Sequence, residues 1–215
     1  MDPRLASQNR LDAVVISSAI ASWRSWRGDI LDGVEEAHQV AAAAGLGETI
    51  VGQLTFAYTL LLSSQFQGFC RDLHLAVADA YFLYVAEHSI AAANVLRSRL
   101  VEGRKLDQGN PSPANIGSDF GRFAVRFWDR IVSLHPHAEH AKQRLDMLCL
   151  WRNSIAHSDF SDPRLGANRL QPGAKPTLTL DEARDFRRAC DELATVFDSF
   201  AHDLLVVLVE GPPRP

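Results

Sequence analysis

The sequence predicts an all-α protein, an antiparallel bundle of five to seven helices in a single domain over residues 1–215. Apolar residues recur at steps of three and four along most of the chain, and the alternation typical of strands is almost absent. Hydrophobic residues make up 47% and charged residues 22%, which is ordinary for a globular domain and argues against disorder. Two stretches rich in Gly, Pro, Asn and Ser, about residues 103–117 and 158–178, are predicted to be irregular.

The first half of the chain predicts four helical segments. Residues 11–27 form the first, with Gly28 as the expected break before the second. Gly45 is suited to end the second helix in a left-handed conformation. The longest periodic segment, residues 48–88, is expected to be a central helix contacted on several sides. Gly68 is a candidate kink within it, and residues 89–100 form a further helix.

The second half predicts three more helices around the irregular stretches. A helix is expected over residues 118–134, with its aromatic side chains on one side. The next helical run is expected over Ala138 to Ile155, and Pro136 suits the first position of that helix. Thr179 and Glu182 match a capping box at the start of the last helix.

Charge and cysteine usage restrict the class of protein. The formal net charge of −4 excludes a generally cationic nucleic-acid coat. RNA binding would therefore need a local basic patch, for which there are two candidate groups: Arg97, Arg99, Arg104 and Lys105, or Arg122, Arg126 and Arg130.

The three cysteines (Cys70, Cys149 and Cys190) are widely spaced and show no C-x-x-C pattern, which predicts reduced, buried thiols in a cytosolic protein. No apolar run approaches the ~20 residues of a membrane span. Residues 11–21 fit an amphipathic helix better than a signal peptide, so we expect a cytoplasmic protein without a membrane partner.

The sequence motifs of common cofactor and metal sites are missing. There is no P-loop, no dinucleotide-binding glycine pattern and no H-E-x-x-H. His135, His137 and His140 cluster around Pro136, but the H-x-x-E-H pattern fails because its first His would fall on Pro136. We therefore expect no cofactor and no metal ion.

One short string does carry chemistry, namely Arg152-Asn153-Ser154-Ile155-Ala156-His157 at the end of a predicted helix. Its Arg supplies a fixed cation and its His a group that titrates near neutral pH, a pair suited to a phosphodiester. The steps of three and four from Leu145 predict that Arg152 lies on the apolar face. A charge there is costly unless it is paired or functionally required.

This string resembles the R-x(4–6)-H motif of the HEPN superfamily of helical-bundle domains, in which Asn, Asp or His usually follows the Arg. The stretch from Ser64 to Leu73 also resembles the long early helix of that family. Many relatives carry an acidic residue in this helix, whereas this chain has Gln67 at the position that we take to correspond.

The resemblance implies a metal-independent endoribonuclease of a toxin–antitoxin or antiviral defence type, with RNA as substrate. It also implies a homodimer whose two motifs face each other, and an antitoxin or sensor partner. Arg152, Asn153 and His157 are then the catalytic candidates. The candidates for supporting the site or contacting RNA are Gln67, Arg71, Asp72 and Ser154.

Helix geometry agrees with a composite site. Residues five apart on an ideal helix are separated by ~140° around the axis and ~7.5 Å along it. Arg152 and His157 of one chain therefore converge poorly on one phosphate unless the helix unwinds before His157. A twofold axis beside the motif would bring two copies of each residue together.

Two alternatives remain open at this stage. Arg152 could pair with a buried acid such as Asp72, while His157 stabilises the helix C-terminus, where a cation is favourable by ~0.3–1 kcal/mol. The chain would then be a non-catalytic HEPN-like module that binds nucleotides, RNA or protein. The second alternative is an unrelated helical interaction protein.

Overall fold

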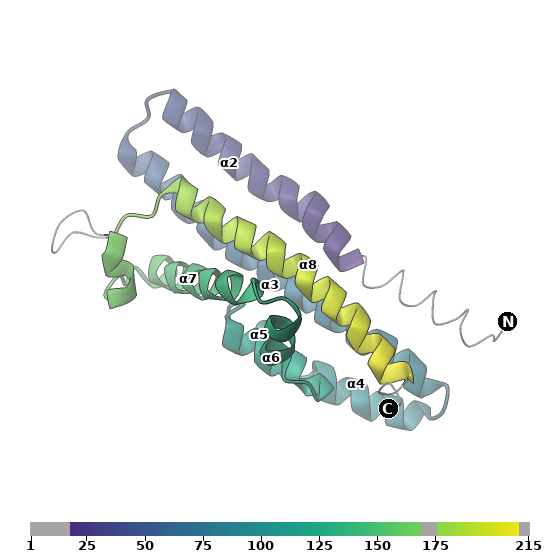
Figure 1. Cartoon of the computed structure of the whole chain (residues 1–215). Helices are drawn as coiled ribbons and strands as arrows, with labels where there is room; N and C mark the ends of the chain where they lie inside the picture. Colours follow the sequence, from purple (N-terminus) through teal and green to yellow (C-terminus); the bar gives the residue numbers. More distant parts are fainter. Residues whose placement is uncertain (1–17, 169–175, 211–215) are drawn as a thin grey trace.

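A computed structural model describes residues 18–168 and 176–210, and the helices in these ranges surround one long central helix (Figure 1). No strand occurs in either range, so the predicted all-α class is confirmed. The α-helices are α2 (Gly28–Ala43), α3 (Glu48–Ala86), α4 (Ile90–Val101), α5 (Pro113–Phe120), α6 (Phe127–Leu134), α7 (Ala138–His157) and α8 (Leu180–Glu210). Short helical turns are η1 (Trp23–Arg27), η2 (Lys105–Asp107), η3 (Gly121–Phe123) and η4 (Pro163–Asn168).

Helix α3 is the centre of the bundle. It spans 39 residues, and α2, α4, α7 and α8 all contact it. Tyr58, Leu62, Phe66, Phe69 and Leu73 follow one another at steps of four, four, three and four, and each is fully buried. Helices α3 and α8 start at the end of the bundle where α2 and α7 finish, so α2 and α7 run opposite to them (Figure 1).

The core is rich in aromatic rings contributed by several helices. Phe197 of α8 lies with its ring centroid 6.2 Å from that of Phe66, 6.3 Å from that of Phe120 and 5.0 Å from that of Phe127. Burial of such side chains is worth about 1.5–3 kcal/mol each. The amphipathic pattern of the sequence therefore corresponds to a single packed interior within the described residues.

The expected breaks near the first helices are placed differently. Gly28 is helical and does not break the helix. The non-helical dihedral angles occur instead at Ser25, inside η1. Gly68 does not end or divide α3. Its missing side chain instead makes room for the guanidinium of Arg27, which would clash with a Cβ there. Gly45, with φ of +70°, ends α2 as predicted. Residues 11–17 of the first predicted helix lie outside the described residues.

The stretch predicted as an irregular loop over residues 103–117 is partly helical. It contains η2 and the start of α5, where Ser112 accepts a hydrogen bond from the backbone N–H of Asn115 and Pro113 occupies the first turn. The helix predicted over residues 118–134 is divided by η3 and by Ala124, whose φ is +60°. The prolines were interpreted as signals of a loop, but Pro is also favoured in the first turn of a helix, where Pro113 lies.

The starts of α7 and α8 were predicted from different residues, a proline for α7 and a capping box for α8. Helix α7 begins at Ala138, as predicted, and Pro136 lies in the turn before it rather than at the first helical position. The capping box is confirmed, since Glu182 N–H donates to the Thr179 hydroxyl and Thr179 N–H donates to the Glu182 carboxylate, both at 3.2 Å. No strand is found in the described part of residues 158–178, which contains η4.

Candidate functional site

The string that begins at Arg152 lies at the C-terminal end of α7. Asn153 and His157 are exposed, Arg152 is half-buried and Ser154 is buried. The helix ends in a Schellman motif, in which Ser158 N–H donates to the Ile155 carbonyl and Asp159 N–H to the Ser154 carbonyl. Ser158 takes the left-handed conformation, with φ of 53°. The chain therefore stays helical up to His157.

Arg152 does not lie on the fully buried face of α7, contrary to the prediction. Trp151, which is 1% exposed, and Ser154 take the buried positions near the end of the helix. Three residues of a helix turn ~300°, so the steps of three from Leu145 to Leu148 and on to Trp151 rotate the buried stripe. Arg152 is left at the edge of that stripe, where its guanidinium can reach solvent.

Arg152, Asn153 and a residue far away in the sequence form a hydrogen-bonded group. The Oδ1 of Asn153 accepts a hydrogen bond from Nη1 of Arg152 at 3.2 Å and one from Nδ2 of Asn110 at 3.1 Å. Because a guanidinium can only donate, the atom that it contacts must be the amide oxygen of Asn153. Among the described residues no carboxylate forms an ion pair with Arg152.

Asn110 belongs to the segment that joins α4 to α5, residues 102–112, here named the linking segment. Gln67 of α3 holds this segment, because its Nε2 donates to the carbonyls of Leu106 at 2.5 Å and of Gly109 at 2.7 Å. The carbonyl of Asn110 in turn accepts from Nδ2 of Asn115 at 2.8 Å. Gln67 therefore binds the carbonyl of Gly109, and the next residue, Asn110, binds Asn153.

Arg71 and Asp72 are engaged elsewhere. Nε of Arg71 lies 2.9 Å from Oδ1 of Asp107 in η2. Asp72 pairs with Arg27, with 2.7 Å between Oδ2 and Nη2. The alternative in which Arg152 pairs with Asp72 is therefore wrong, since Arg27, the last residue of η1, supplies a cation that the sequence did not suggest.

His157 shares its surroundings with one acidic residue. It lies in the last turn of α7, two residues before Asp159. The pKa of the Asp159 carboxyl is lowered chiefly by hydrogen bonds from Ser161, whose backbone N–H donates to Oδ1 at 3.0 Å, and to a lesser extent by His157. An anionic group therefore accompanies the imidazole on this surface.

The linking segment rests on a buried polar group. Both carboxylate oxygens of Asp119, which is fully buried, accept backbone N–H groups, one from Lys105 and one from Leu106, each at 2.8 Å. His74 is also fully buried, and its Nε2 lies 3.1 Å from the carbonyl of Asp119. Nη1 of Arg104 approaches Nδ1 of His74 at 3.5 Å. Burial and the nearby Arg104 lower the pKa of His74 to about 4.

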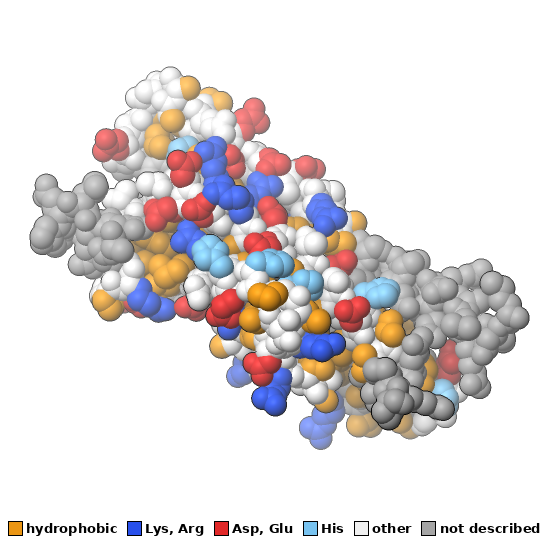
Figure 2. Space-filling model, in the orientation of Figure 1, with side chains coloured by type: hydrophobic (Ala, Val, Ile, Leu, Met, Phe, Trp, Pro, Cys, Tyr) orange, Lys and Arg blue, Asp and Glu red, His pale blue; other side chains and the backbone are white. Residues whose placement is uncertain are grey.

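The basic groups suggested by the sequence do not form continuous patches. Arg97 pairs with Asp79 at 2.8 Å, and the buried Arg104 pairs with Asp107 at 3.0 Å. Arg122 donates to backbone carbonyls at the end of α4, including that of Glu102 at 2.7 Å. Figure 2 shows acidic and basic side chains interspersed over the visible face.

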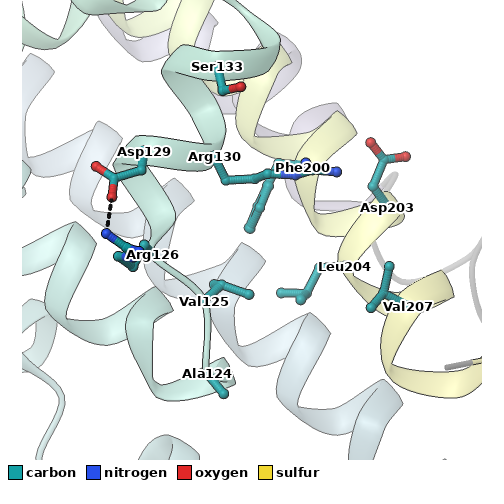
Figure 3. A pocket seen from close by; sticks show the side chains of 10 residues that line it. All are labelled: Ala124, Val125, Arg126, Asp129, Arg130, Ser133, Phe200, Asp203, Leu204 and Val207. Atoms are coloured by element: carbon teal, nitrogen blue, oxygen red, sulfur yellow. Dashed lines mark ion pairs between the residues drawn. The ribbon is translucent and has the colours of Figure 1, made fainter. Parts of the chain in front are cut away.

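A groove between α6 and α8 has a volume of about 680 Å³ (Figure 3). Phe200, Leu204 and Val125 give it an apolar floor, while Arg126 pairs with Asp129 at its rim. It lies near the C-terminal part of α8, whereas the Arg152 string precedes the start of α8. The groove and the string are thus separate features.

The described residues offer no group of three or more His, Cys, Asp or Glu side chains arranged to hold a metal ion. The three cysteines are buried and unpaired, as predicted. Within the same ranges no helix has both the length and the apolar composition needed to cross a membrane.

The sequence did not reveal the part played by Asn110. It lies 43 residues before Asn153 in a stretch that reads only as a turn, and no periodic pattern reports a contact over that separation. The Gly-Asn-Pro string around it was the one available local signal.

No protein-family model, curated protein or solved structure matches this chain. What its residues can do chemically therefore follows from the site itself. A guanidinium with no carboxylate partner in residues 18–168 and 176–210, an amide bonded to it and an exposed imidazole lie within six residues at one helix end. Such a set can bind a phosphate and transfer a proton.

Proposed function

We propose that this chain is a HEPN-like, metal-independent endoribonuclease of the toxin–antitoxin or antiviral defence type. The observation that carries the proposal is the state of Arg152. Arg152 is half-buried, has no ion-pair partner among the described residues and donates a hydrogen bond to Asn153. The exposed His157 follows Arg152 by five positions. A cation kept free of carboxylates is suited to an anionic substrate.

The reaction assigned to the site is transesterification of RNA. The 2′-oxygen attacks the adjacent phosphorus, the bond from phosphorus to the 5′-oxygen breaks, and the products carry a 2′,3′-cyclic phosphate and a 5′-hydroxyl. His157 accepts the proton of the 2′-hydroxyl or supplies one to the leaving oxygen. Arg152 stabilises the charge on the non-bridging oxygens, and Asn153 orients the phosphate or His157.

A homodimer completes the proposed site. Because α7 remains helical through His157, the two side chains start ~140° apart around the axis and ~7.5 Å apart along it. A second copy related by a twofold axis beside α7 would place its own Arg152 and His157 opposite these. One imidazole can then take the proton while the other gives one, so that both proton transfers are served.

The test is cleavage of mixed RNA in the presence of EDTA by the wild type, Arg152→Ala and His157→Ala. We expect losses of ~10²–10³-fold for Arg152→Ala and ~10²–10⁴-fold for His157→Ala. His140→Ala, at an exposed position on the same helix, is the matched control and should keep full activity. Cleavage that survives both site substitutions would overturn the assigned roles, and RNA binding without cleavage would favour a non-catalytic binding module.

The dimer and the partner are tested separately. Sedimentation of the wild type should give twice the chain mass of 23.8 kDa. Expression of the wild type should be toxic to its host, His157→Ala should relieve that toxicity, and an antitoxin or sensor protein should restore growth. A monomer that cleaves RNA at the full rate would contradict the composite site.

A further inference from the structure

Gln67 lies at the position that we take to correspond to an acidic residue of many HEPN members, yet its contacts suit an amide only. Its Nε2 carries two hydrogens and faces two backbone carbonyls, those of Leu106 at 2.5 Å and Gly109 at 2.7 Å. A carboxylate there would meet two carbonyl oxygens without a hydrogen to share. Gln67 is therefore matched to holding the linking segment rather than to replacing an acidic group.

We infer that Asn110 is a positioning residue for the Arg152–Asn153 pair and that Gln67, by binding the linking segment, fixes where Asn110 lies. The inference rests on the proposed ribonuclease function. It identifies Asn110 as an additional member of the site and gives Gln67 a defined role.

The orientation of Asn153 follows from these contacts. Its Oδ1 accepts from Arg152 at 3.2 Å and from Asn110 at 3.1 Å, so both lone pairs of the oxygen are used. The amide nitrogen of Asn153, for which the described residues show no bonded acceptor, is turned the other way with two hydrogens to donate. Asn153 itself is exposed, so without Asn110 its amide would rotate between several positions.

The linking segment is bonded to the rest of the fold before and after Asn110. Asp119 binds the N–H groups of Lys105 and Leu106 at 2.8 Å each, while Gln67 binds the carbonyls on the opposite side of the same turn. After Asn110, Pro111 is buried and Ser112 caps α5. Asn110 thus projects from backbone that is anchored before and after it.

The experiment compares Gln67→Glu and Asn110→Ala with the wild type, and Gln65→Glu is the matched control. Gln65 lies two residues from Gln67 on α3, but its Oε1 accepts a hydrogen bond from Arg27 at 2.9 Å. A carboxylate at position 65 can accept the same hydrogen bond. Hydrogen exchange of the amides of residues 106–110 reports on the segment without any need for activity. Steady-state RNA cleavage in EDTA then gives kcat and KM.

We expect Gln67→Glu to accelerate exchange in residues 106–110 at least tenfold at pH 7.5, and Gln65→Glu to leave it unchanged. The acceleration should diminish at pH 5, because a protonated carboxyl regains one donor. Asn110→Ala should lower kcat about 3- to 10-fold, as the loss of one neutral hydrogen bond implies, with little change in KM. Gln67→Glu should lower kcat at least as much.

Each outcome bears on one statement. Unchanged exchange in Gln67→Glu would overturn the role of Gln67. Accelerated exchange with unchanged kcat, or a change in KM alone for Asn110→Ala, would overturn the positioning role. If the wild type cleaves no RNA, the proposed function fails, and the exchange data still decide whether Gln67 holds the segment.

Discussion

The buried imidazole of His74 makes the stability of this protein dependent on pH in a defined window. Its pKa is lowered from 6.5 to about 4 by burial and by Arg104. Between these values the unfolded chain binds a proton at His74 that the folded protein does not bind, so the free energy of unfolding falls as the pH falls. The slope approaches about 1.4 kcal/mol per pH unit, and the free energy of unfolding falls by about 2.5 kcal/mol between pH 7.5 and pH 4.5. Above about pH 7.5 this contribution is constant, because His74 is then neutral in the folded and in the unfolded chain.

Urea unfolding of the wild type and of His74→Gln at pH 7.5, 6.5, 5.5 and 4.5 measures this effect. The glutamine offers a donor and an acceptor but does not titrate, and the other ionisable groups cancel in the difference between the two proteins. We expect that difference to shift in favour of His74→Gln by about 2 kcal/mol between pH 6.5 and 4.5. A difference independent of pH would refute a neutral imidazole enclosed between Arg104 and Asp119.

Three further predictions concern α7 and the core. Ser158→Gly should raise the free energy of unfolding by about 0.5–1 kcal/mol in thermal melts, because φ of 53° strains any residue with a Cβ; a lower melting temperature would contradict the Schellman geometry. Trp151→Ala should lower it by about 3–5 kcal/mol in urea, and a loss below 1 kcal/mol would show that Trp151 is not core. Cys70, Cys149 and Cys190 should resist a thiol reagent until the protein unfolds, since burial raises the pKa of all three thiols, that of Cys149 to about 12; rapid native labelling would refute this.

The helices were predictable from the sequence where the signal is local. Gly45 and the Thr179–Glu182 pair end and begin helices through bonds to residues within five positions, so their sequence context is sufficient. The apolar positions of α3 were also predictable, because a long helix contacted on several sides repeats its apolar residues over many turns.

Contacts between distant segments were not predictable. Asp72 pairs with Arg27, 45 residues away, and the sequence contains no pattern that links the two. Arg152 lies at the edge of the buried stripe because the neighbouring Trp151 occupies the core position, and tertiary packing determines which of the two is buried. The roles of Gln67 and Asn110 likewise arise only when the linking segment folds against α3 and α7.

The proposed chemistry is tested most directly with one RNA oligonucleotide and a copy that has a single 2′-deoxy nucleotide at the mapped cleavage position, both incubated with the wild type in EDTA. We expect the RNA to be cut to a 2′,3′-cyclic phosphate and a 5′-hydroxyl, the deoxy position to stay intact, and His157→Ala to cut neither. Cleavage at the deoxy position, a 3′-hydroxyl and 5′-phosphate as products, or full activity of His157→Ala would contradict the proposed chemistry.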